Sequence, residues 1–174
     1  MKHFITIVLY YAADCFVALT CCRFHPDGEL FAAGASDGHV KIFSVSSGTQ
    51  AANLDEGGAC GAIQAITFSE NGYWLAVVAQ GSTYASVWDL RKETKIKVLD
   101  IGSQINSIAW DYTGQFLALA GPGGLSVQQY AKSTKEWLEP FRSAAPTVVV
   151  EWGERAQSLV TMNPEGRITV VGSE

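Results

Sequence analysis

The residues that could act in catalysis are few, and no spacing in the sequence brings them together. His25 stands before Pro26 in an expected turn, and His39 begins an expected strand. A nucleophilic triad needs a serine or cysteine, a histidine and a carboxylate within hydrogen-bonding reach. The sequence places neither a nucleophile nor a carboxylate beside these histidines, so we expect no catalytic residue.

The cysteines do not follow a metal-binding pattern. The chain has four of them, at Cys15, Cys21, Cys22 and Cys60. They form no C-x-x-C pair, and no histidine lies at zinc-finger spacing from them. We therefore expect no metal site and interpret the cysteines as reduced structural thiols of an intracellular protein.

A glycine-rich loop at 121–124 could suggest a phosphate cradle. Its sequence is Gly-Pro-Gly-Gly, without the Lys-Ser or Lys-Thr and the following helix that a phosphate-binding loop requires. We interpret it as a turn and expect no cofactor.

One basic cluster stands out in an otherwise acidic chain. It consists of Arg91, Lys92, Lys95 and Lys97. A run of like charges is most often a solvated outer loop. The alternative is a docking patch for a partner protein.

Composition predicts a folded domain that does not bind nucleic acid over a broad surface. Of the 174 residues, 48% are hydrophobic and 17% charged, which allows a sizeable core. The net charge of -5 opposes contact with a phosphate backbone, which needs clustered lysine and arginine. Direct nucleic-acid binding is therefore not expected.

The segment 1–18 is atypical of the rest of the chain. Lys2 followed by the apolar run at 4–13 resembles the start of a secretory signal peptide. A membrane helix of about 20 residues would extend into the segment 19–24, which the repeat described below assigns to a strand. Because FITIVLYY is strongly β-prone, a strand is the preferred interpretation, and no membrane contact is expected.

The rest of the chain repeats with a period of about 40 to 45 residues, the length of a four-stranded blade in a WD-repeat propeller. Matching turns follow Phe24 (FHPDG), Phe68 (FSENG), Trp110 (WDYTG) and Trp152 (WGERA), each one such period after the last. A second series keeps the same period: Phe43, Trp88, Tyr130 and Val171. Two independent series therefore agree, and Trp88-Asp89 is the dipeptide that marks the third strand of such a blade.

Short polar clusters with glycine divide each repeat into hairpins and leave no room for crossover helices. We therefore predict an all-β fold, a WD-repeat β-propeller with four blades at 19–54, 63–99, 105–138 and 147–174. The predicted strands are 19–24, 29–34, 39–45 and 49–54; 63–68, 73–79, 85–90 and 95–99; 105–110, 115–120, 125–130 and 136–138; 147–152, 157–162 and 167–171.

The fourth blade lacks a fourth strand in this prediction. An open blade leaves unpaired backbone groups along its outer edge. The spare strand at 4–11 is the expected partner of 167–171.

Closing a ring with four blades requires about 90° between neighbours, whereas seven blades need only about 51°. We therefore expect the chain to be part of a seven-bladed ring, from a truncated or misassigned gene model. Exposed apolar flanks on blades one and four would then promote association.

With the repeats in register, several segments resemble one known family. They are LTCCRFHPDGELFAAG, IQAITFSENGYWLAV, SVWDLRK and FLALAG. Over residues 19–174 they are similar to the C-terminal propeller of the pre-mRNA-processing factor 19 family. The resemblance implies a nuclear protein of the spliceosome, active in mRNA splicing and DNA repair within an E3 ubiquitin ligase complex.

In that family the resemblance implies a U-box, which recruits the ubiquitin-conjugating enzyme, and a coiled coil that makes a tetramer. Neither is found in this sequence, so no ligase activity is expected of this chain. What carries over is a surface for splicing-complex subunits and ubiquitination substrates.

Complete WD blades often link His, Ser or Thr, Asp and Trp by buried hydrogen bonds. No blade here has the full set, because Gly57 and Gly58 stand where a Gly-His is expected. We predict that the blades rely on apolar packing, and that Asp37, Trp88 and Asp89 are structural residues.

The sequence thus predicts a non-catalytic protein-interaction scaffold. Two alternatives remain: a WD-repeat adaptor of an unrelated assembly, and a truncated non-functional product. An enzymatic propeller is disfavoured because no His, Asp or Glu recurs at matching repeat positions.

Overall fold

The computed structural model describes residues 17–57, 61–153 and 157–172. Within these ranges every helix or strand is a β-strand, and the strands form four antiparallel sheets. The predicted all-β propeller architecture is therefore confirmed. The predicted pairing of segment 4–11 lies outside the described residues.

Each sheet follows the chain in order, so neighbouring strands are joined by hairpins. The strands of the first two sheets are β1 (Leu19–Phe24), β2 (Leu30–Ala35), β3 (His39–Ser44) and β4 (Gln50–Asp55), then β5 (Ile63–Phe68), β6 (Trp74–Ala79), β7 (Tyr84–Asp89) and β8 (Thr94–Asp100). Those of the last two are β9 (Ser107–Trp110), β10 (Phe116–Gly121), β11 (Gly124–Ala131) and β12 (Glu136–Ser143), then β13 (Val149–Trp152), β14 (Ser158–Met162) and β15 (Ile168–Gly172).

The hairpin turns use the chemistry that the sequence predicted. In the second blade, Ser69 to Gly72 reverse the chain, and the Gly72 amide donates to the Ser69 carbonyl at 2.8 Å. Gly72 has a φ of +71°, a conformation that glycine adopts without steric cost. Asn71 completes the turn by accepting the Tyr73 amide at 2.9 Å.

Most predicted strands agree with the structure to within two positions at each end, but β12 is longer than predicted. The sequence placed this strand at 136–138, whereas it runs from Glu136 to Ser143 and includes Pro140. Val127 pairs with Phe141 and Gln129 with Leu138, so the pairing is bulged around Pro140. Proline is tolerated at such bulges and on edge strands.

The core lies between neighbouring sheets rather than inside any one of them. One cluster joins the first two sheets through residues such as Val40, Leu54 and Leu75. A second joins sheets two and three around Leu99 and Leu117, and a third joins sheets three and four around Val150. Each blade therefore buries its faces against its neighbours, as repeat proteins do.

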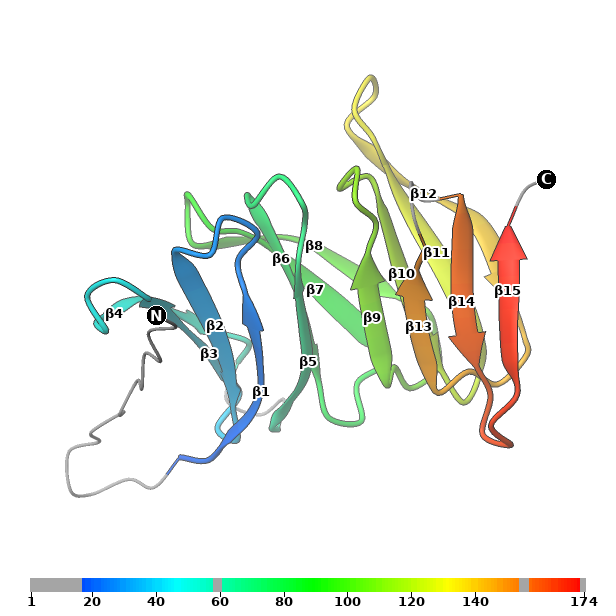
Figure 1. Cartoon of the computed structure of the whole chain (residues 1–174), viewed down its shortest axis with the longest axis horizontal. Helices are drawn as coiled ribbons and strands as arrows, with labels where there is room; N and C mark the ends of the chain where they lie inside the picture. The colour runs from blue at the N-terminus through cyan, green and yellow to red at the C-terminus, as the bar shows by residue number, and fades with distance from the viewer. Residues whose placement is uncertain (1–16, 58–60, 154–156, 173–174) are drawn as a thin grey trace, which may run out of the picture.

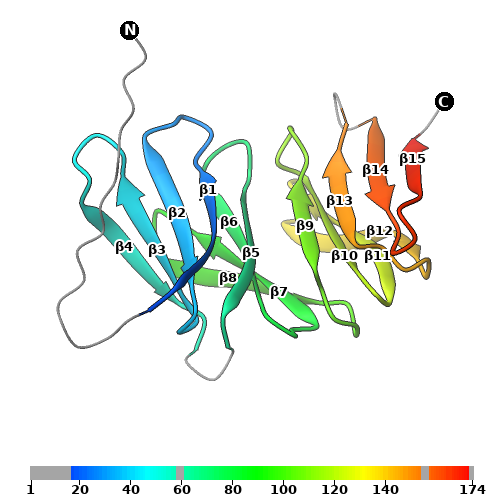
Figure 2. The same ribbon diagram turned by 60° about the horizontal axis from the view of Figure 1, so that its bottom comes forward.

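The first strands of the blades pack in sequence, β1 on β5, β5 on β9 and β9 on β13. Figure 1 shows these four strands side by side, with the four sheets in an open row. In Figure 2 the other strands of each sheet fan away from this line. Among the described residues, no helix is long and apolar enough to span a membrane.

Candidate functional site

A buried polar network ties the first blade to Trp88 in the second. Glu56 directly follows β4 and is 6% exposed. Its carboxylate accepts hydrogen bonds from Ser86 Oγ at 2.8 Å, from Lys95 Nζ at 2.9 Å and from Trp88 Nε1. Charge-assisted hydrogen bonds of this kind are stronger than neutral ones.

This network adds a buried polar contact to the apolar packing between blades that the sequence predicted. The sequence has Gly57 and Gly58 where a Gly-His pair is expected, so no blade has the complete set of hydrogen-bonding His, Ser or Thr, Asp and Trp residues. Instead, the carboxylate of Glu56, the residue before Gly57, accepts a hydrogen bond from Trp88 of the second blade. The sequence signal that could have indicated this contact is Glu56 itself, an acidic residue directly before the position where the Gly-His pair is expected.

Asp37 and Asp89 both hold turns. The Asp37 carboxylate accepts the amide of His39 at 3.1 Å between β2 and β3. Asp89, which is 5% exposed, accepts the amide of Arg91 at 3.0 Å and its guanidinium Nη2 at 2.9 Å. Both carboxylates therefore contact turn backbone, and their structural role stays a prediction.

The ion pair between Asp89 and Arg91 shifts the pKa of both side chains. Hydrogen bonds from Arg91 lower the pKa of Asp89 below its ordinary value, although burial opposes the shift. In turn the Asp89 carboxylate raises the pKa of Arg91. The Arg91 guanidinium also lies 4.3 Å from the ring centroid of Tyr73, a cation–π geometry.

The predicted basic cluster is therefore divided. Arg91 is paired with Asp89, and Lys95 is paired with Glu56 while lying over the Trp88 ring. Lys92 and Lys97 are exposed. The four cations do not form one free patch, and a docking role for the cluster stays a prediction.

Exposed aromatic residues mark the turns that join the first and second strands of three successive blades. Phe24 is 63% exposed, Tyr73 50% and Tyr112 54%. We call the surface formed by these three turns the turn face. Large apolar side chains that stay exposed in this way are typical of interaction sites.

The turn face is continuous across the blades. His25 Nε2 lies 2.9 Å from the carbonyl oxygen of Gly72, which joins the first turn to the second. Gly114, in the third turn, packs near Asn71 and Ser69 in the second. Exposed carboxylates of Asp27, Glu29 and Glu70 accompany the aromatic rings on these turns.

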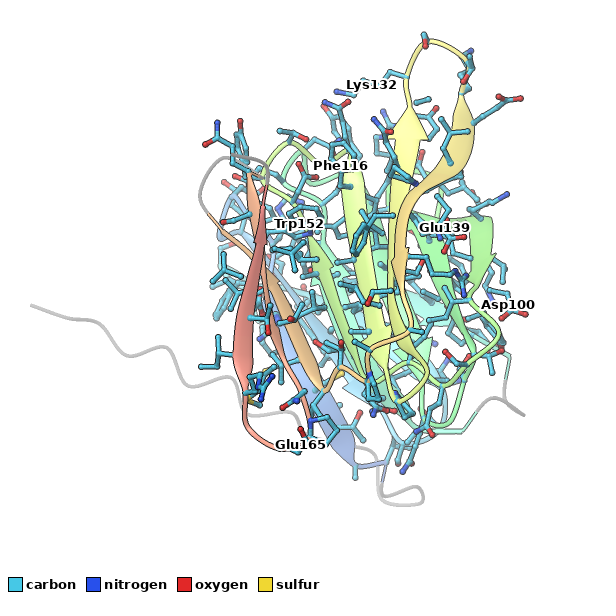
Figure 3. All side chains as sticks on the ribbon, turned by 90° about the vertical axis from the view of Figure 1, so that its right-hand side faces the viewer. Asp100, Phe116, Lys132, Glu139, Trp152 and Glu165 are labelled. Atoms are coloured by element: carbon cyan, nitrogen blue, oxygen red, sulfur yellow. The ribbon has the colours of Figure 1, made fainter. Side chains whose placement is uncertain are left out.

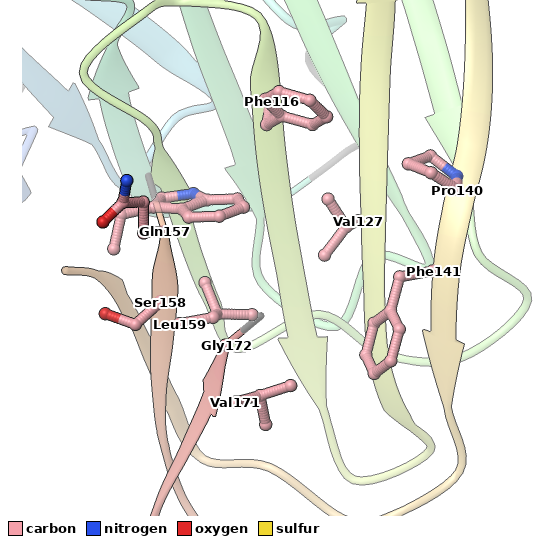
Figure 4. A pocket seen from close by; sticks show the side chains of 10 residues that line it. Phe116, Val127, Pro140, Phe141, Gln157, Ser158, Leu159, Val171 and Gly172 are labelled. Carbon is pink, nitrogen blue, oxygen red and sulfur yellow. The ribbon is translucent and has the colours of Figure 1, made fainter. Parts of the chain in front are cut away.

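A second feature is an apolar groove between the third and fourth blades, with a volume of about 280 Å³ (Figure 4). Phe116 and Trp152 lie at one end with ring centroids 6.0 Å apart (Figure 3). The other lining residues include no titratable side chain: Val127, Pro140, Phe141, Gln157, Ser158, Leu159, Val171 and Gly172. Such a groove suits apolar side chains of a partner, and its lining places no acid or base beside the Ser158 hydroxyl.

Among the described residues, no three or more His, Cys, Asp or Glu side chains gather as metal ligands. Cys21 is partly buried, and this burial raises the pKa of its thiol, which makes the reactive thiolate scarcer. Chemistry at this thiol is thereby disfavoured.

Comparison with known proteins identifies two family models. Residues 11–44 match the model described as WD domain, G-beta repeat. Residues 35–171 match the model described as eukaryotic translation initiation factor eIF2A, which covers parts of all four blades.

Similar curated proteins carry the name pre-mRNA-processing factor 19. The chain is 33% identical to that of Schizosaccharomyces pombe over 119 residues, which are 68% of this chain and 24% of the relative. It is 32% identical to homolog 2 of Arabidopsis thaliana over 161 residues, 90% of this chain and 30% of the relative. The Homo sapiens protein is 41% identical over 123 residues, 70% of this chain and 23% of the relative. The chain thus spans about a quarter to a third of the length of these relatives.

The fold is also found in a solved structure described as Crystal Structure of Mitotic Checkpoint Complex. The TM-score is 0.72 at 17% identity, covering 86% of this chain and 49% of the other. This likeness supports the propeller architecture alone.

Proposed function

Because the chain belongs to the WD-repeat family of pre-mRNA-processing factor 19 and also falls within the eIF2A family model, we propose that it is a non-catalytic docking propeller. Its place is in the nucleus, in a pre-mRNA-splicing complex with ubiquitin ligase activity. There it binds splicing subunits and ubiquitination substrates, while other parts of the complex carry out the ligase reaction.

The turn face is the observation that carries this proposal. Phe24, Tyr73 and Tyr112 expose half or more of their surface on three adjoining turns. Aromatic residues dominate the energetics of protein interfaces because they bury large areas with few rotatable bonds. The neighbouring carboxylates favour a partner surface with lysine or arginine at its rim.

A purification experiment tests the proposal. The tagged chain is incubated with nuclear extract, and the recovered proteins are identified by mass spectrometry. We expect splicing-complex proteins, and we expect their recovery to fall at least about tenfold for the triple variant Phe24→Ala, Tyr73→Ala, Tyr112→Ala, which removes three exposed anchors. The control Ile168→Ala removes one apolar side chain, 67% exposed, from β15 and should leave recovery unchanged.

The match of residues 35–171 to the eIF2A model favours a second candidate, an adaptor of a translation assembly. Incubation with cytosolic extract separates the two. Recovery of initiation factors there, with no splicing proteins from the nuclear extract, would replace the first proposal by the second.

A further inference from the structure

Four aromatic rings pack together between the second and third blades. They are Trp74 on β6, Trp110 on β9, Tyr130 on β11 and Trp137 on β12. The Trp74 and Tyr130 rings meet edge to face at 4.7 Å, and Trp137 lies 5.5 Å from Tyr130 and 6.0 Å from Trp110. Trp110 is 8% exposed, and its ring also lies 6.1 Å from that of Trp74.

The three outer rings line a hollow of about 470 Å³, which we call the aromatic groove. Its remaining walls come from the outer strand β8 and from the hairpin that joins β11 to β12: Ile96, Lys97, Lys135 and Glu136. The groove therefore lies at the seam between two blades, next to the second turn of the turn face, since Trp74 directly follows Tyr73.

The polar atoms of these rings distinguish this cluster from the other tryptophans. The chain has five tryptophans. Trp88 Nε1 donates to Glu56, and Trp152 Nε1 donates to the Ala109 carbonyl at 3.0 Å. The Nε1 of Trp110 is buried without a partner among the described residues. The indole N–H groups of Trp74 and Trp137 and the hydroxyl of Tyr130 have no acceptor among the described residues, so the side chains that line the groove carry donors without protein acceptors.

The charges at the rim oppose a cationic ligand. Lys97, Lys135 and Glu136 are exposed, and no ion pair forms between them and other described residues. Two ammonium groups against one carboxylate leave the rim positive. A methylated lysine, which aromatic cages also bind, would meet this charge unfavourably.

We propose that the aromatic groove binds a proline-rich segment of a partner protein with an acidic residue beside its prolines. Polyproline II segments have fully solvated backbone carbonyls, which are the acceptors that the groove's unpaired donors require. The proline rings of such a segment pack on aromatic side chains, and the preformed polyproline II conformation lowers the conformational entropy lost on binding. The acidic residue complements Lys97 and Lys135 at the rim.

Titration of the purified chain with a labelled synthetic peptide tests this inference. The probe is a proline-rich peptide carrying one aspartate, followed by fluorescence anisotropy. We expect saturable binding that weakens at least about tenfold for Trp137→Ala and about twofold to tenfold for Tyr130→Phe, which removes only one hydrogen-bond donor. A peptide with lysine in place of the aspartate should bind more weakly at low salt.

The matched control is Leu138→Ala, since Leu138 is 49% exposed on the same strand but does not line the groove. It should bind as the unmodified chain does, and circular dichroism confirms that each variant is folded. Equal binding by Trp137→Ala, a preference for the lysine peptide, or no saturable binding by the folded chain would each overturn the inference. Because only purified components are used, these results stand apart from recovery of splicing proteins.

Discussion

At the scale of single residues, one carboxylate joins two blades. Glu56 belongs to the connection from the first blade, yet its oxygens bind Ser86 and Trp88 on β7 and Lys95 on β8. A buried carboxylate is stable only when it is paired and hydrogen-bonded. Removal of the Glu56 carboxylate would therefore leave all three partners without this hydrogen-bond acceptor.

We predict that Glu56→Ala destabilises the fold by about 3 kcal/mol, because it leaves the Trp88 N–H and the Lys95 ammonium without their acceptor. Glu56→Gln should cost less, since the amide oxygen can still accept from Trp88 while the ion pair with Lys95 is lost. Urea unfolding monitored by tryptophan fluorescence measures both.

Glu29→Ala is the control, because Glu29 is exposed and has no ion pair within the described part of the chain. Surface substitutions of this kind usually change stability by less than about 0.5 kcal/mol. If Glu56→Ala unfolds at the same urea concentration as Glu29→Ala, the network contributes nothing to stability.

The sequence predicted a structural role for Trp88 but could not identify its partner Glu56. The repeat pattern places a histidine at one fixed position of each blade. The Trp88 indole N–H, however, needs only a hydrogen-bond acceptor within reach, whatever its position in the sequence. The glutamate satisfies that requirement from the neighbouring position, and only the path of the chain after β4 shows it. The pairing of Lys95 escaped sequence reasoning for the same reason, because its partner Glu56 follows another blade.

At the scale of elements, hairpin chemistry predicted strand positions well because glycine and polar residues recur at each reversal. The exception was β12, which the sequence ended at Leu138. Proline lacks an amide hydrogen and therefore argues against a strand. The bulge opposite Gln128 and the position of β12 at the sheet edge remove that objection.

The backbone at Gly121 lies so close to that at Gln104 that only glycine fits there. Gly121 ends β10, and a Cβ atom added there would lie 1.8 Å from the backbone oxygen of Gln104. A backbone atom cannot move aside as the end of a flexible side chain can. We predict that Gly121→Ala destabilises the fold by more than about 2 kcal/mol, as measured by thermal or urea unfolding.

Gly48→Ala is the matched comparison. Gly48 has a φ of +67° but no atom within 4 Å of an added Cβ, so its substitution should cost only the conformational strain of about 1 kcal/mol. Equal losses for the two variants would show that the contact with Gln104 is not what requires glycine at Gly121.

At the scale of the whole molecule, the repeat period was sufficient to predict four sheets, and the core between sheets follows from it. Every blade buries apolar residues on both faces wherever a neighbour is present. The aromatic groove and the turn face could not be predicted in this way. The turns that carry the turn face recur with the repeat, but the sequence does not show that their aromatic side chains stay exposed, and the aromatic groove arises where side chains from different blades meet.

The fourth sheet exposes apolar residues in a manner that predicts association. All described residues of β15 are exposed, with Ile168 at 67% and Val170 at 65%. A strand of this kind at a sheet edge can pair with a strand of another molecule. We predict that the purified chain forms larger species as its concentration rises, measured by size-exclusion chromatography with light scattering.

Lysine on an exposed strand opposes such pairing by its charge and by the cost of burying it. Val170→Lys should therefore shift the distribution toward monomer. Thr169→Lys adds the same charge on the same strand while keeping the apolar side chains of Ile168 and Val170, and it should have the smaller effect. A chain that stays a monodisperse monomer at every concentration would show that this edge does not drive association. Equal effects of the two variants would instead assign the association to net charge rather than to the apolar residues of β15.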